Sequence, residues 1–125
     1  MYVHRNAELA AAALPGIQHT TLANADLGAR RLSLWRQTIA PGVATPPHRH
    51  DCEEVVLVEA GRGELLIDGV AVEFGPDSTL VLPAGRDHQI VNSGDEPLRL
   101  LAAFPQTPVR TLLPDGQPID LPWRS

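Results

Sequence analysis

The chain lacks several features that mark whole classes of protein. Its 125 residues include one cysteine, so no disulfide can form within it and nothing points to secretion. The most apolar N-terminal stretch, LAAAALPGI, is too short to span a bilayer. It also follows HRNAE rather than the basic segment that opens a signal peptide. We therefore expect a cytoplasmic protein that does not insert into a membrane.

Basic charge is also scarce. The chain has 10 Lys and Arg against 15 Asp and Glu, which gives a net charge of −5. Proteins that bind nucleic acid carry a basic stripe for the phosphates, and this composition argues against one. No Lys/Arg-rich amphipathic segment is present that could lie on a membrane surface. The expected partner is a small-molecule ligand or substrate.

Proline and glycine, in contrast, are frequent in the chain and mark expected turns. Its 12 prolines and 10 glycines separate short apolar runs, as in all-β domains. Asp68-Gly69 between ELLI and VAVEF predicts a two-residue type I′ hairpin, and only NAELAAAAL could form a short helix. We expect one domain, residues 1–125, built as a β-sandwich or barrel. The expected strands are GIQHTTL, RRLSLWRQTI, EVVLVEA, GELLI, VAVEF, STLVLP, HQIVN, PLRLLAAF and PVRTLLP.

Metal-binding side chains gather ahead of one of these apolar runs. His48 and His50 stand two apart, so on a strand both side chains leave the same face, about 6–7 Å apart at Cα. Glu54 could not reach the same ion on that strand, since four extended residues span about 13 Å. We therefore expect a turn at DCE and a carboxylate that points back from the next strand. His88, after the tight turn PAGRD, supplies a fourth donor.

This donor set favours a Lewis-acid site over a closed structural one. Three neutral imidazoles and one carboxylate suit a single divalent transition metal: Mn, Fe, Co, Ni, Zn or Cu. Open coordination positions would remain for water or substrate. The alternative is a polar turn with a stray core histidine. Glu53 is the rival to Glu54, because a slip of one residue sends a side chain to the other face.

Two stretches of the sequence resemble the motifs of the cupin superfamily. Residues 42–61 have the form G-x5-H-x-H-x3-E-x6-G without a gap. Residues 77–92 are similar to G-x5-P-x-G-x2-H-x3-N, except that Asp77 replaces the first glycine. The resemblance implies an all-β, double-stranded β-helix, a jelly-roll barrel with the ion inside its mouth. It also implies a homodimer, as in many cupins, in which GIQHTTL and PVRTLLP would cover exposed edges.

Strand parity predicts the wall of the substrate pocket. In PLRLLAAF an outward Arg99 sends alternate residues inward, including Leu100, Ala102 and Phe104. In RLSLWRQTI parity is undecided, and the cupin pattern implies that Trp35 and Gln37 face the barrel interior. Packing alone is an equal alternative for Trp35.

The remaining polar residues have simpler interpretations. His19 has no partner at ligand spacing and is interpreted as a surface or edge-strand residue. Cys52 is interpreted as a small apolar filler rather than a thiol that a redox metal would oxidise. Arg86 and Asp87 are interpreted as turn residues.

The site residues leave two function classes open. The first is an enzyme that acts on a small organic molecule with chelating oxygens, by dioxygenase-like or by isomerase- or decarboxylase-like chemistry. Glu54 is then the catalytic candidate, since no Lys or Tyr is placed as a base. The second is a non-catalytic cupin that binds a small ligand or a metal. A storage role is the least favoured.

Overall fold

The computed structural model describes residues 2–125 and is almost entirely β. Two three-residue 3₁₀ helices, η1 (Asn6–Glu8) and η2 (Ala25–Leu27), accompany the strands. The strands are β1 Ala11–Leu14, β2 Ile17–Ala23, β3 Ser33–Ile39, β4 Arg49–His50, β5 Glu54–Ala60, β6 Gly63–Ile67, β7 Val70–Phe74, β8 Ser78–Leu82, β9 His88–Asn92, β10 Leu98–Phe104 and β11 Thr111–Leu112. The all-β prediction is confirmed.

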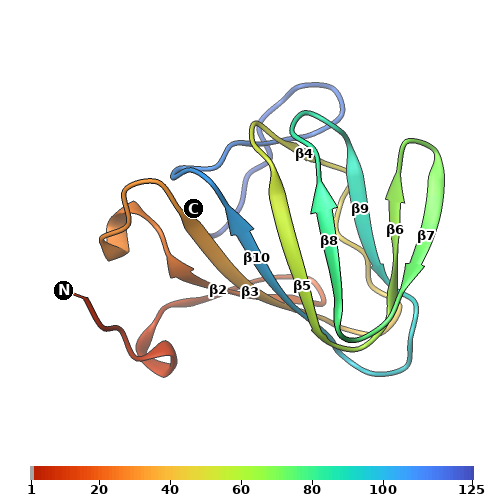
Figure 1. Cartoon of the computed structure of the whole chain (residues 1–125), viewed down its shortest axis with the longest axis horizontal. Helices are drawn as coiled ribbons and strands as arrows, with labels where there is room; N and C mark the ends of the chain where they lie inside the picture. The colour runs from red at the N-terminus through yellow and green to blue at the C-terminus, as the bar shows by residue number, and fades with distance from the viewer. Residues whose placement is uncertain (1) are drawn as a thin grey trace.

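The strands form two facing layers of antiparallel sheet (Figure 1). One layer is a six-stranded sheet in the order β1-β2-β3-β10-β5-β8. The other combines the sheet β7-β6-β9 with the pair β11-β4. Backbone bridges Ala44↔Val91 and His48↔His88 join the segment before β4 to β9, so the two small sheets continue into one another. This is the jelly-roll arrangement predicted from the sequence.

The core lies between the layers and follows the two-residue period of the strands. In β10, Leu98, Leu100, Ala102 and Phe104 are buried, whereas Arg99 is exposed. In β5, Val56 and Val58 are buried between exposed neighbours. Because alternate side chains leave opposite faces of a sheet, each strand gives one apolar row to the core. That buried row holds the barrel together through the hydrophobic effect.

Two turns take the left-handed backbone that their residues permit. Asp68 and Gly69 have φ of 53° and 74°, and Ile67 pairs with Val70 across them, as expected for a type I′ hairpin. Asp77, which stands at a glycine position of the second motif, has φ of 61°. Aspartate is one of the few non-glycine residues that tolerates this region, so the turn forms without the glycine.

The alanine-rich N-terminal segment is a strand rather than the short helix it could have formed. Only Asn6–Glu8 is helical, and Ala11–Leu14 forms β1, which pairs with β2 across Pro15-Gly16. Gly16 has φ of 73°, which suits this tight turn. An isolated helix of nine residues is marginal in water, whereas pairing with β2 satisfies the backbone directly. Within residues 2–125, no helix is long and apolar enough to cross a membrane.

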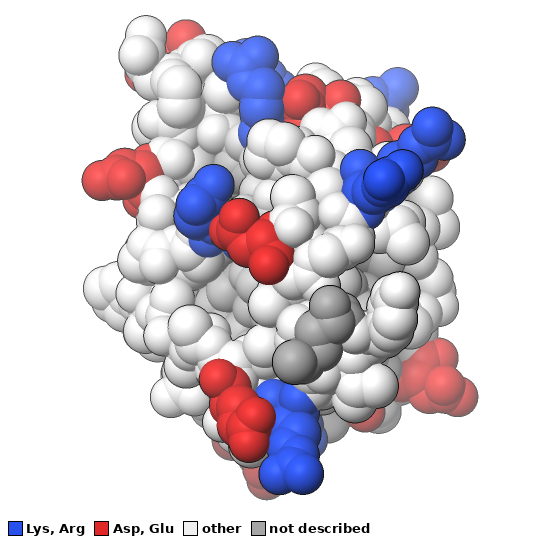
Figure 2. Space-filling model, turned by 90° about the vertical axis from the view of Figure 1, so that its left-hand side faces the viewer, with Lys and Arg blue, Asp and Glu red and all other residues white. Residues whose placement is uncertain are grey.

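Charge on the surface is mixed in sign. On the face shown in Figure 2, basic and acidic side chains stand beside one another and do not gather into a stripe of one sign. Exposed ion pairs include Arg86 with Asp68 at 2.8 Å and Arg36 with Glu59 at 3.4 Å. Such pairs contribute little to stability, on the order of 0–1 kcal/mol each.

Candidate metal centre

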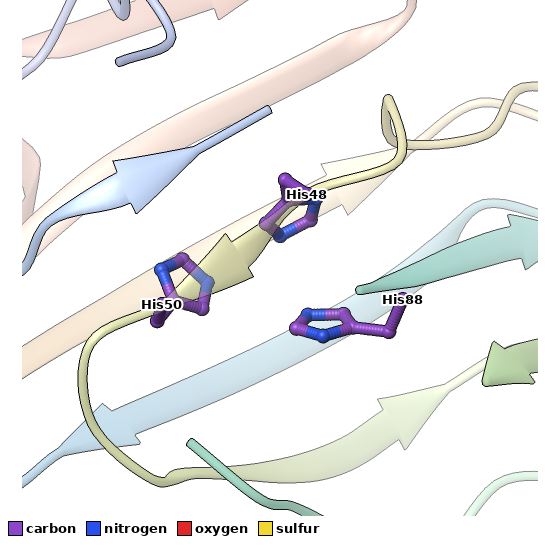
Figure 3. A group of neighbouring side chains, drawn as sticks. All are labelled: His48, His50 and His88. Atoms are coloured by element: carbon purple, nitrogen blue, oxygen red, sulfur yellow. The ribbon is translucent and has the colours of Figure 1, made fainter. Parts of the chain in front are cut away.

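Backbone pairing between two strand segments brings the histidines together. The His48 amide donates to the His88 carbonyl at 3.1 Å, and the His88 amide donates back at 2.8 Å. Residues opposed in this way direct their side chains to the same face of the sheet. His50 lies two residues beyond His48 and shares that face. Figure 3 shows the three imidazole rings gathered around a common space.

Glu54 reaches the same space from the other layer. Residues 51–53 turn the chain, and the Asp51 carboxylate fixes this turn by accepting from the Gln106 side chain at 2.6 Å and the Arg110 amide at 3.0 Å. Glu54 then opens β5 as a buried residue, only 6% exposed, whereas Glu53 is exposed. The structure thus places Glu54, and not its neighbour, beside the histidines.

A hydrogen bond at Nδ1 orients each imidazole. His48 Nδ1 donates to the Pro46 carbonyl at 2.6 Å, and His88 Nδ1 donates to the Arg86 carbonyl at 3.0 Å. A carbonyl can only accept, so in the neutral ring Nε2 keeps its lone pair. His50 Nδ1 lies 3.0 Å from the Thr111 hydroxyl. Ligating histidines in metal sites are held in this way.

The donor atoms of the three histidines lie close together, and Glu54 lies close to two of them. One ligand nitrogen from each histidine lies within 4.8 Å of the others. Glu54 Oε1 lies 3.4 Å from His50 Nε2 and 3.5 Å from His88 Nε2. Two atoms each about 2.1 Å from one metal ion are roughly 3.0–3.4 Å apart in octahedral or tetrahedral geometry. Glu54 Oε1 and His88 Nε2 are buried without a hydrogen-bond partner, which a bound cation would supply.

The electrostatics of the cluster favour an ionised carboxylate. Burial alone would raise the pKa of Glu54, but the contacts with His50 and His88 outweigh it and lower this pKa to about 2. Burial and the neighbouring imidazoles lower the pKa of His48 to about 4. Burial would also lower the pKa of His88, yet the adjacent Glu54 carboxylate raises it. A metal ion would replace the protons that the carboxylate draws to this cluster.

A cavity of about 50 Å³ adjoins the donor atoms, with room for several water molecules. Trp35 and Gln37 line it, in agreement with the barrel-facing side that the cupin pattern implies. Leu100, Ala102 and Phe104 do not line it, contrary to the prediction from strand parity. The rest of its wall, besides the four donor residues, is formed by Leu14, Ile17, Thr45, Pro46, Ile90, Thr111, Ile119, Leu121 and Trp123.

The inward side chains of β10 lie in the core but do not reach the cavity. The Phe104 ring packs against Trp35, with ring centroids 4.4 Å apart, and against His50 at 5.0 Å. These two residues therefore stand between β10 and the cavity. The C-terminal residues Ile119, Leu121 and Trp123 also line the cavity. The sequence interpretation missed them, although their apolar side chains alternate with Asp120 and Pro122 at a two-residue period.

His19 was wrongly assigned to the surface. Its exposed fraction is 2%, and it contacts Gln37 and Thr21 through its two ring nitrogens. Its ring stacks on Trp123 with centroids 3.9 Å apart and an angle of 5° between the planes. Strand β2 is not an edge strand, because β1 pairs with its outer side. The two-residue period from the buried Ile17 was the signal that could have found it.

The structure also shows the surroundings of Cys52, Arg86 and Asp87, which lie near the donor residues in sequence. Cys52 is 8% exposed and joins the apolar core, and burial together with the acidic neighbours raises the pKa of its thiol to about 11. A protonated, buried thiol matches the interpretation as a small apolar filler. Arg86 and Asp87 form ion pairs with Asp68 and Arg49, as expected of turn residues.

Comparison with known sequences gives relatives for most of the chain. Residues 35–104 match the model of the cupin domain. Auxin-binding protein 1 of Arabidopsis thaliana is 37% identical over 79% of this chain and 55% of its own length. Auxin-binding protein T92 of Nicotiana tabacum is 38% identical over 80% of this chain and 60% of its own length. The chain thus spans little more than half the length of these relatives.

Comparison with solved structures identifies proteins of similar fold. The polyketide cyclase RemF from Streptomyces resistomycificus superposes with a TM-score of 0.74 at 27% identity, over 88% of this chain and 84% of that one. An oxalate decarboxylase of Bacillus subtilis superposes with a TM-score of 0.80 at 19% identity, over 90% of this chain and 32% of that one. With the matching family model and the jelly-roll topology, these likenesses establish that the chain belongs to the cupin family.

Proposed function

We propose that His48, His50, Glu54 and His88 hold one divalent transition metal ion, and that the adjoining cavity takes up a small organic molecule by an oxygen-bearing end and transforms it. The observation that carries this proposal is the pair of buried, unpartnered atoms, Glu54 Oε1 and His88 Nε2, that face a shared space. A bound ion of this kind would supply a Lewis acid for the oxygen of the substrate. The donor set suits Mn, Fe, Co, Ni, Zn or Cu.

The protein's own groups have distinct parts in this function. Glu54 is the single anionic donor and offsets part of the charge of the ion. The carbonyls of Pro46 and Arg86 keep two imidazoles in the tautomer that presents Nε2. Apolar walls such as Ile17 and Ile90 limit water near the reacting atoms. A dry surrounding strengthens each electrostatic contact with the substrate.

Catalysis is supported by likeness to an enzyme of similar extent. RemF, whose name describes a polyketide cyclase, is covered over 84% of its chain, so little of that enzyme lies outside the shared fold. A further cupin structure, at 26% identity and a TM-score of 0.68, is described as a sugar phosphate isomerase. Small cupins of this size therefore include enzymes, and the reaction class of the present chain is part of the proposal.

A non-catalytic binding module is the second candidate, and two observations favour it. The relatives with higher identity are named for binding auxin, not for a reaction. In addition, the side chains that line the cavity include no Lys, Tyr or Asp, and their single carboxylate is Glu54. A general base would then have to be this metal-facing carboxylate.

Turnover assays on the metal-loaded protein separate the two candidates. Untagged protein would be loaded in turn with each candidate metal and supplied with diketones, hydroxy acids and catechols, while oxygen uptake and product formation are followed. We expect one metal to support turnover of at least one compound class. Saturable binding with no product from any class would assign the chain to the binding module, and absence of binding would contradict both candidates.

A further inference from the structure

A chain of three hydrogen bonds runs from the C-terminal segment to the cavity wall. The Thr21 hydroxyl donates to the backbone carbonyl of Arg124 at 3.0 Å. His19 Nε2 lies 2.8 Å from the Thr21 oxygen, and Gln37 Nε2 lies 2.9 Å from His19 Nδ1. Of these four residues, Gln37 is the one that lines the cavity.

The first bond fixes the direction of the others. A carbonyl only accepts, so the Thr21 hydrogen is used on Arg124 and the Thr21 oxygen is left to accept. His19 therefore donates from Nε2, and because a neutral imidazole has one N–H, its Nδ1 accepts. The Gln37 amide must then turn its NH₂ group toward His19. Its carbonyl oxygen, Oε1, is left as an acceptor for the cavity.

The environment of His19 keeps this arrangement in place. Trp123 stacks on the ring at 3.9 Å, and Trp35 meets it edge-on at 5.1 Å. Burial lowers the pKa of His19 to about 4, so the ring is neutral near pH 7. Among residues 2–125, no protein group donates a hydrogen bond to Gln37 Oε1.

The other polar groups of the cavity wall indicate which functional group a bound molecule would carry. The Thr45 hydroxyl already accepts from the Ile90 amide at 3.0 Å, and the Thr111 hydroxyl is engaged with His50. The indole N–H groups of Trp35 and Trp123 are buried without an acceptor. Outside the metal centre, the residues of the cavity wall therefore include the acceptor Gln37 Oε1, the hydroxyl of Thr45, which can still donate, and two indole N–H groups without an acceptor. A hydroxyl group can satisfy both kinds, since it donates and accepts, whereas a methyl group satisfies neither.

We infer that the molecule bound beside the metal centre carries a hydrogen-bond donor, typically a hydroxyl group, which Gln37 Oε1 accepts, and that His19 is the positioning residue behind this preference. The inference rests on the proposed function, because the donor atoms of the centre take the other, oxygen-bearing end. It assigns specificity to residues outside both cupin motifs.

The tautomer of His19 tests the inference without any ligand. Long-range proton–nitrogen NMR correlation of the zinc-loaded full chain reports which ring nitrogen carries the proton. The expected result is a protonated Nε2 and an unprotonated Nδ1 at pH 7. A proton on Nδ1 would turn the Gln37 NH₂ group toward the cavity and overturn the inference, whatever the function of the site.

Matched ligand pairs test the preference itself. Isothermal titration of the zinc-loaded chain would compare β-hydroxypropionate with butyrate, and para-hydroxybenzoate with para-methylbenzoate, which differ by a hydroxyl in place of a methyl. We expect wild type to prefer the hydroxyl member of at least one pair by about tenfold, the size of one buried hydrogen bond. Gln37→Met should abolish the preference, and Gln37→Glu, which still accepts, should retain it. His19→Phe keeps an aromatic ring against Trp123 and should also abolish it.

The outcomes separate this inference from the function on which it rests. Unchanged zinc content and melting temperature in Gln37→Met would show that its site is intact. Equal binding of both members of every pair by wild type, or a preference that survives Gln37→Met, would overturn the inference and leave the proposed function standing. Failure of wild type to bind any of the four acids would contradict the proposed function and the inference together.

Discussion

The two sides of the cavity are built in different ways. On the metal side, all four proposed donors come from residues 48–88, and the spacing of the two cupin motifs predicts that they share an ion. The structure groups the three histidines among them. On the other side, β2, β3 and the C-terminal segment contribute His19, Gln37 and Trp123, which are far apart in sequence and form no motif. In the proposed function, the first side holds the ion and the second selects the ligand. Changes on the two sides should therefore have separable effects.

The largest expected effect is loss of metal from the first side. His48→Ala or His88→Ala removes one donor of four, and the affinity for zinc should fall by at least about 100-fold. The fold should survive, because the buried rows of β5 and β10 supply the core without the ion. Zinc titration and circular dichroism measure the two quantities. Unfolding of metal-stripped wild type at room temperature would contradict this separation.

A smaller effect should distinguish the two adjacent glutamates. Glu54→Gln keeps the shape of the donor but removes its charge, which makes the bound ion more electrophilic and less tightly held. If the chain is an enzyme, turnover should fall by at least about tenfold while some metal remains. Glu53→Gln is the matched control, since the Glu53 side chain is exposed. Equal losses in the two variants, measured at full metal loading, would refute the assignment of Glu54.

Acid should destabilise the second side through His19. Its folded pKa of about 4 lies below the usual 6.5, so between these values the unfolded chain binds the extra proton and stability falls as pH falls. A shift of this size corresponds to about 3 kcal/mol. In metal-stripped protein, the stability advantage of wild type over His19→Asn should shrink by about that amount between pH 6.5 and pH 4. Urea unfolding measures it, and a gap that stays constant with pH would show that His19 is not buried as a neutral ring.

Removal of the C-terminal ring should affect only the second side. Trp123→Ala takes away the stack on His19 and should lower the free energy of unfolding by about 2 kcal/mol, less than for a fully buried tryptophan. The zinc stoichiometry should not change. Val72→Ala, on an exposed site of β7, is a control that should alter neither quantity. Loss of zinc from Trp123→Ala would mean that the two sides are not separable.

Homodimer formation remains a prediction with the smallest consequence for the site. The sequence assigned the contact to GIQHTTL and PVRTLLP, but GIQHTTL contributes β2, which pairs with both β1 and β3 and has no free edge. Val55, Leu57 and Val81 instead form an exposed apolar group on β5 and β8, a kind of surface that a second copy commonly covers. Light scattering at micromolar concentration should give twice the mass of the chain. A monomeric mass would remove the dimer and leave the metal and ligand predictions unaffected.

The sequence predicted the first side of the cavity better than the second for a physical reason. Strand parity and one turn are enough to converge His48, His50 and Glu54, and both operate over a few residues. The two-residue period from Ile17 could place His19 on the buried face of β2, but its contacts with Gln37 on β3 and with Trp123 join distant segments, which no local pattern encodes. Leu100 was predicted to point inward and does so, but parity cannot say whether a ligand or another side chain lies beyond it.

The most direct test of the metal centre is a crystal structure of the untagged, metal-loaded chain with anomalous scattering recorded at the absorption edge of the metal. The account predicts one anomalous peak per chain, bound by Nε2 of His48, His50 and His88 and by a carboxylate oxygen of Glu54, at about 2.0–2.2 Å from each. A structure at full occupancy in which the ion binds elsewhere, or in which Glu54 turns away from it, would contradict the central claim.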